Sequence, residues 1–68
     1  MPDTPITFED VRVFDATPLS LRCQVNGKMV RVGRAQMLEG TTIANAGDRG
    51  RLVVRRVTAR DLGLVEPS

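Results

Sequence analysis

Short runs of alternating apolar and polar residues make up much of this chain, which is the pattern of β-strands with one buried face. The clearest example covers residues 20–33, where Asn26-Gly27 separates two alternating runs. An Asn-Gly pair between such runs predicts a two-residue type I′ turn and therefore an antiparallel hairpin. The pairing of the two strands then follows by counting outward from the turn.

This register places nearly all the apolar residues of the hairpin on one face. The pairs on the apolar face are Val25 with Lys28, Cys23 with Val30, and Leu21 with Val32. The pairs on the other face are Gln24 with Met29, Arg22 with Arg31, and Ser20 with Gly33. A slip by one residue would mix the two faces, so the predicted register is self-consistent.

A further strand is predicted over residues 6–15, before Thr17-Pro18 breaks the pattern. Phe8 and Val11 fall in opposite phases of the alternation, so a regular strand would turn one of them away from the core. An extra residue near Glu9-Asp10, a β-bulge, brings both phases to the same face.

The second half of the chain contains shorter signals. Residues 34–39 are rich in helix formers and predict a single turn, while residues 41–43 predict a short strand. Residues 45–50 form a polar turn sequence, and the apolar run within residues 51–55 predicts a strand covered on both faces.

A short helix is predicted from residue 56 to residue 62. Thr58, with Asp61 three residues later, resembles a capping box at the helix start. Gly63 followed by Leu64 fits the glycine and apolar partner that end many helices.

Four to five short strands and a C-terminal helical turn predict a mainly β fold, a small partly open barrel of the SH3-like or OB-like kind. The 68 residues leave room for one domain. We assign residues 6–65 to this domain, residues 1–5 to an N-terminal tail and residues 66–68 to a C-terminal tail.

The composition argues against an enzyme, a cofactor or a metal. The chain has no His, Trp or Tyr and only one cysteine, Cys23, so neither an intramolecular disulfide nor a structural zinc site can form. Without a His to activate its thiol, Cys23 is expected to be buried core. The lack of disulfides and the polar first residues predict a reducing cytoplasm, and no segment is long enough to span a membrane.

The charge is unevenly distributed. Residues 20–60 carry nine basic residues and two acidic ones, a local net charge of +7 within a chain of net charge +2. The arginines of this segment are the candidate binding residues: Arg22, Arg31, Arg34, Arg49, Arg51, Arg55, Arg56 and Arg60. Arg22 and Arg31 face each other across the hairpin, which destabilises a sheet unless an anion compensates. Either Asp10 and Asp15 of the first strand neutralise them internally, or an external partner does.

Two stretches follow a common pattern. Residues 30–37 (Val-Arg-Val-Gly-Arg-Ala-Gln-Met) are similar to a strand followed by Arg/Lys-Ser-Gln-Ile. Residues 47–54 (Gly-Asp-Arg-Gly-Arg-Leu-Val-Val), with Ala59 and Gly63-Leu64 behind them, are similar to a Gly-Asp-x-Gly-x-Leu-Val-Ile ending. Over residues 20–65 the chain thereby resembles small uncharacterised proteins encoded by bacteriophages and other mobile elements. The resemblance implies an accessory β-domain acting in the cytoplasm of a bacterial host, and it carries no known activity.

These observations predict a small, non-enzymatic binding module that contacts nucleic acid through an arginine-rich face. The alternative is a protein-binding inhibitor or adaptor, for example one that blocks a host nucleic-acid enzyme, or a small subunit of an assembly. Its partner would then be an acidic protein surface, or a second copy joined through a strand edge.

Overall fold

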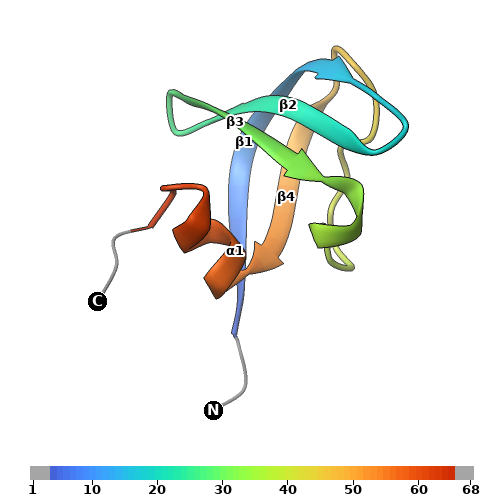
Figure 1. Cartoon of the computed structure of the whole chain (residues 1–68). Helices are drawn as coiled ribbons and strands as arrows, with labels where there is room; N and C mark the ends of the chain where they lie inside the picture. Colours follow the sequence, from blue (N-terminus) through green and yellow to red (C-terminus); the bar gives the residue numbers. More distant parts are fainter. Residues whose placement is uncertain (1–3, 66–68) are drawn as a thin grey trace.

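The computed structural model describes residues 4–65 and contains one antiparallel sheet of four strands (Figure 1). The strands are β1 (Pro5–Ala16), β2 (Ser20–Val25), β3 (Lys28–Gly33) and β4 (Arg49–Arg55), in the spatial order β3-β2-β1-β4. A 3₁₀ turn, η1 (Arg34–Gln36), follows β3, and a helix, α1 (Arg56–Asp61), follows β4. The predicted mainly β fold with one short helix is confirmed. Of the predicted tails, residues 1–3 and 66–68 lie outside the described residues.

The predicted hairpin is confirmed in every pair. β2 and β3 are antiparallel, from Ser20 opposite Gly33 to Val25 opposite Lys28. Asn26 and Gly27 have φ angles of 52° and 80°, and two positive values are what a type I′ turn requires. The turn chemistry therefore fixes the register of this half of the sheet.

β1 is a long strand that belongs to two pairings. Its first half pairs with β4 and its second half with β2, and the strand bends between them (Figure 1). The predicted bulge is confirmed, because Phe8 lies opposite Leu52 but Val11 lies opposite Gly50, with Asp10 at a φ of 61°. A second register shift, between Val13 and Asp15, was not predicted.

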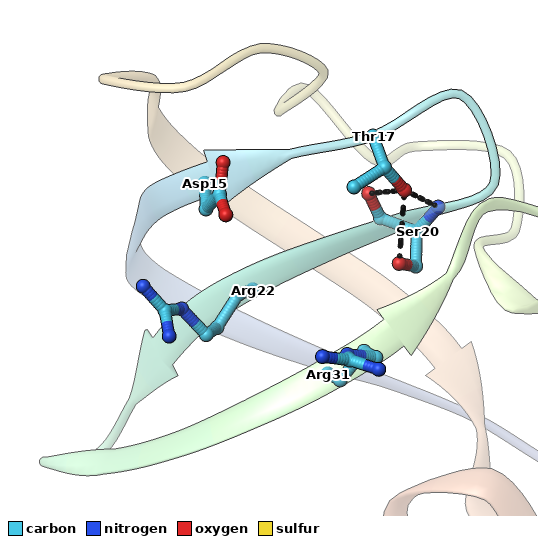
Figure 2. A pocket seen from close by; sticks show the side chains of 5 residues that line it. All are labelled: Asp15, Thr17, Ser20, Arg22 and Arg31. Carbon is cyan, nitrogen blue, oxygen red and sulfur yellow. Dashed lines mark hydrogen bonds between the residues drawn. The ribbon is translucent and has the colours of Figure 1, made fainter.

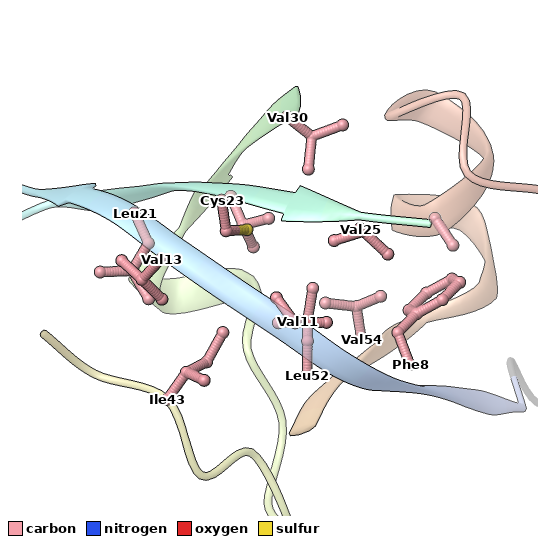
Figure 3. Packing of buried hydrophobic residues seen from close by; sticks show 12 residues of the cluster. Phe8, Val11, Val13, Leu21, Cys23, Val25, Val30, Ile43, Leu52 and Val54 are labelled. Atoms are coloured by element: carbon pink, nitrogen blue, oxygen red, sulfur yellow. The ribbon is translucent and has the colours of Figure 1, made fainter. Parts of the chain in front are cut away.

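The core lies on the concave side of the bent sheet (Figure 3). It is built from the inward residues of all four strands together with Ile43 and Ala59: Phe8, Val11, Val13, Leu21, Cys23, Val25, Val30, Val32, Ile43, Leu52, Val54 and Ala59. Cys23 is fully buried, as predicted, and this burial raises the pKa of its thiol. The thiol therefore stays protonated and serves as a small apolar group.

The segment between η1 and β4 covers the outer edge of β4. Met37 forms an isolated bridge with Val54, and the Leu38 N–H donates to the Val53 carbonyl (2.8 Å). Thr41 Oγ1 accepts from the Val53 N–H (3.0 Å), and Thr42 Oγ1 accepts from the Arg51 N–H (2.9 Å). The prediction of a strand over residues 41–43 is wrong, because threonine hydroxyls occupy the β4 donors that a strand would have paired through its backbone.

Helix α1 covers nearly the predicted span, but the predicted cap is wrong. The residue before the helix is Arg55, which makes no side-chain cap, while Thr58 lies inside the helix with only 8% of its surface exposed. The chain enters α1 directly from β4, so Thr58 packs inward instead of capping. At the other end the Leu64 N–H donates to the Ala59 carbonyl (2.8 Å) after Gly63 (φ 76°), as predicted.

Candidate nucleic-acid interface

The side of the sheet that faces away from the core carries most of its polar groups, and we call it the outer face. One row across the strands runs Arg31, Arg22 and Asp15, on β3, β2 and β1. The next row runs Met29, Gln24, Arg12 and Arg49, from β3 to β4. The outer face therefore brings four arginines from four strands into two adjacent rows.

Arg22 and Arg31 lie directly opposite each other in the register. Counting from the turn makes them a non-hydrogen-bonded pair, the pair type in which Cα atoms approach to about 4.5 Å and side chains lie closest. Within residues 4–65, neither guanidinium lies at ion-pair distance from a carboxylate. Asp15 faces Arg22 in the register, but no ion pair joins it to either arginine.

A shallow hollow of about 50 Å³ lies beside this pair (Figure 2). Its lining is Asp15, Thr17, Ser20, Arg22 and Arg31. The Thr17 hydroxyl accepts from the Ser20 N–H (3.0 Å) and lies 3.1 Å from Ser20 Oγ, which fixes both hydroxyls at the edge of the hollow. Asp15 faces Arg22 in the register, but its Oδ1 accepts from the Ala16 N–H (3.0 Å) instead.

The acidic residues of the first bulge form ion pairs with two other arginines. Arg49 Nε and Nη2 both lie 2.9 Å from Asp10 Oδ1, and Arg51 Nε lies 3.7 Å from Glu9 Oε2. Asp10 therefore reduces the charge repulsion between Arg49 of β4 and Arg12 of β1, which lie opposite each other. The suggestion that Asp10 neutralises Arg22 and Arg31 is wrong, because the bulge directs its carboxylate to β4.

The other predicted arginines do not join the outer-face rows. The Arg34 Nε donates to the Thr17 carbonyl (2.9 Å), so it ties η1 to the turn before β2. Arg55 lies opposite Pro5 at the far end of β4, and Arg56 and Arg60 lie on α1. These last three are exposed but form a separate group from Arg22 and Arg31.

Two outer-face residues were missed by the sequence analysis. Arg12 lies outside the basic segment of residues 20–60, and the sheet places it between Gln24 and Arg49. Phe14 was not among the candidate binding residues, and it is 48% exposed. Phe14 follows the inward Val13 by one residue, so the alternation of Val11 and Val13 is the signal in the sequence that turns it outward.

The chemistry that this arrangement offers is binding of anions. Within the part of the chain that the structure describes, no group of three or more His, Cys, Asp or Glu residues could hold a metal ion, and no helix is long and apolar enough to cross a membrane. Guanidinium groups beside hydroxyls suit phosphate oxygens, which arginine can bind through two parallel hydrogen bonds. No family model, no curated protein and no solved structure matches this chain.

Proposed function

We propose that this protein is a small, non-enzymatic module that binds nucleic acid through its outer face. The opposed pair of Arg22 and Arg31, with no carboxylate at ion-pair distance among the described residues, is the observation that carries this proposal; the hollow beside it is lined by two hydroxyls and by Asp15. Directly opposed like charges cost a sheet a few tenths of a kcal/mol, and a bound phosphate would remove that cost. Phosphate contacts would dominate affinity and make it depend on salt.

The fold and setting are consistent with such a module. The bend of β1, with its two register shifts, supports a partly open barrel of the SH3-like or OB-like kind. The resemblance of residues 20–65 to phage and mobile-element proteins supports an accessory role in the cytoplasm of a bacterial host.

The test compares Arg22→Gln with Arg60→Gln, a matched loss of one positive charge away from the outer face. Binding to a generic duplex and to a single strand is measured over a range of salt concentrations. Arg22→Gln should weaken binding and reduce the salt slope by about 0.7 to 0.9, the value of one phosphate contact. It should leave the melting temperature unchanged or slightly raised, because it removes a repulsion. Arg60→Gln should change the slope much less.

Two results would overturn the proposal. The first is a dissociation constant weaker than about 10⁻⁴ M at physiological salt, or binding that does not depend on salt. The second is an Arg22→Gln variant that loses stability but keeps its binding, because the arginine would then serve the fold.

The open edge of β3 favours a second candidate, a protein-binding inhibitor, adaptor or subunit. The edge of β4 is covered by residues 37–43. On the free edge of β3, no other backbone segment among the described residues pairs with Met29 or Arg31. An extended acidic segment of another protein could add a strand there, since Arg31 and Lys28 would complement its charge.

Met29→Pro tests this second candidate. It removes a donor on the open edge and leaves the β2–β3 ladder bonds in place, because Met29 is a non-hydrogen-bonded residue of the hairpin. A partner that survives nuclease treatment should bind the unchanged protein and not the variant, provided that both melt as folded proteins. Recovery that nuclease abolishes, or that Met29→Pro leaves intact, contradicts an edge-bound protein partner.

A further inference from the structure

We infer that Phe14 is a stacking platform for an unpaired base, and that the nucleic acid bound by the outer face is single-stranded. This inference rests on the proposed function and specifies its ligand. The chain has two phenylalanines, and the structure treats them in opposite ways. Phe8 is 8% exposed and belongs to the core, whereas Phe14 is 48% exposed and lies outside it.

The alternation along β1 puts Phe14 on the outer face. Val13 lies opposite Cys23 and is buried, so its side chain points inward. Asp15 lies opposite Arg22, an outward residue of β2. Phe14 follows the inward Val13 by one residue, so the alternation along β1 turns it outward, and the register shift places Asp15 on the same face beside it.

Phe14 therefore lies between the two arginine rows. Arg12, two residues earlier on β1, belongs to the row that includes Gln24 and Arg49. Arg22 and Arg31 belong to the other row, in which the residue on β1 is Asp15. A strand of nucleic acid that crosses the sheet at Phe14 would meet Arg12 on one side of the ring and, past Asp15, the two arginines of β2 and β3 on the other.

The chemistry of stacking selects the single strand. A base can lie on an aromatic ring only when its own face is free, and in a duplex the neighbouring base pairs occupy that face. A surface that offered only positive charge would also bind a duplex, through the phosphates of the duplex. The exposed ring is the feature that a duplex cannot use, so the outer face should prefer an unpaired strand.

The chain offers an internal control for a direct observation of stacking. Because Phe8 and Phe14 are the only aromatic residues, the aromatic proton NMR spectrum contains the signals of two rings alone. Oligothymidylate should shift the Phe14 ring signals strongly and leave those of the buried Phe8 nearly unchanged. The same measurement with a duplex of equal charge should shift Phe14 much less.

Substitution gives the second readout. Phe14→Leu keeps an apolar side chain at an exposed position, and Leu19→Ala is a control at another exposed apolar residue. Phe14→Leu should weaken oligothymidylate binding about five- to a hundredfold, the range of a single base–aromatic stack, without changing the salt slope. Phe14→Trp should keep the binding, and its fluorescence should be quenched by the oligonucleotide. Leu19→Ala should change neither affinity nor slope.

The outcomes separate this inference from the proposed function. If the unchanged protein binds neither oligothymidylate nor duplex, both fail. If binding is salt-dependent and is lost in Arg22→Gln, but Phe14→Leu binds as well as the unchanged protein, the proposed function holds and the stacking site is refuted. A duplex that binds more tightly than the single strand also refutes it.

Discussion

Replacing Gly50 by alanine would test how closely the covering segment fits against β4. A Cβ at this position would overlap Thr42 Oγ1, the atom that accepts the Arg51 N–H (2.9 Å). Thr42 must move, so the variant loses a hydrogen bond worth about 0.5–1.5 kcal/mol and strains the contact by about 1–3 kcal/mol. The lower entropy of alanine in the unfolded chain offsets about 0.4–1 kcal/mol of this.

Gly50→Ala should therefore lower the free energy of unfolding by about 2 kcal/mol, which corresponds to a melting temperature roughly 8–16 °C lower for a domain of this size. The sign should reverse in a Thr42→Ala background. There the new Cβ meets only the Cβ of residue 42 and Ile43 Cγ2, each at an ordinary 3.6 Å, so the added methyl should stabilise by about 0.4–1 kcal/mol.

Thermal or urea unfolding of the unchanged protein, both single variants and the double variant measures this coupling. The four free energies of unfolding form a double-mutant cycle. Effects that add to within about 0.5 kcal/mol would show that Thr42 does not hold the edge of β4 in this way.

Three further predictions concern the turn, the core and the loop before β4. Gly27→Val should destabilise by more than about 1 kcal/mol, because a β-branched residue disfavours the positive φ of the turn; an unchanged melting temperature would contradict the turn type. Cys23→Ser should lower stability by about 1–3 kcal/mol, since a hydroxyl would be buried without an assured partner, and rapid reaction of the native thiol with a labelling reagent would contradict its burial. The carboxylate of Asp48 accepts the Asn45 and Ala44 N–H groups (2.8 and 2.9 Å), which lowers its pKa, so its contribution to stability is present above the ordinary value of 3.8 and is lost as the pH falls through the lowered value. Asp48→Asn should therefore lower the melting temperature at neutral pH, with a difference that shrinks in acid; a difference independent of pH would contradict the role of the charge.

The hairpin could be predicted from the sequence in full because its signals are local. Asn26-Gly27 sets the turn, and the alternation on either side sets the faces, so Arg22 had to meet Arg31. The bulge near Asp10 was predicted for a related reason, since only an extra residue brings Phe8 and Val11 to one face.

The features that the sequence analysis missed depend on contacts between distant segments. Phe14 is turned outward by its place after the inward Val13, but the outward position of Asp15 opposite Arg22 follows from how β1 changes register against β2. Thr41 and Thr42 resemble strand residues, but it is their side-chain hydroxyls that accept the Val53 and Arg51 N–H groups of β4, while the Thr42 N–H donates to the Arg51 carbonyl. Thr58 resembles a helix cap, but its side chain is buried in the fold and therefore does not cap the helix.

The unequal edges of the sheet have a consequence for how large an assembly of this protein can grow. A sheet with two bare edges can recruit further copies at both ends and build a filament. Here the threonine-bonded segment closes the edge of β4, so of the two terminal strands of the described sheet only β3 offers free backbone groups along its outer edge. If two copies paired through β3, the open β3 edge of each copy would be occupied by the other. Growth that uses only the two terminal strands of this sheet therefore ends at a pair.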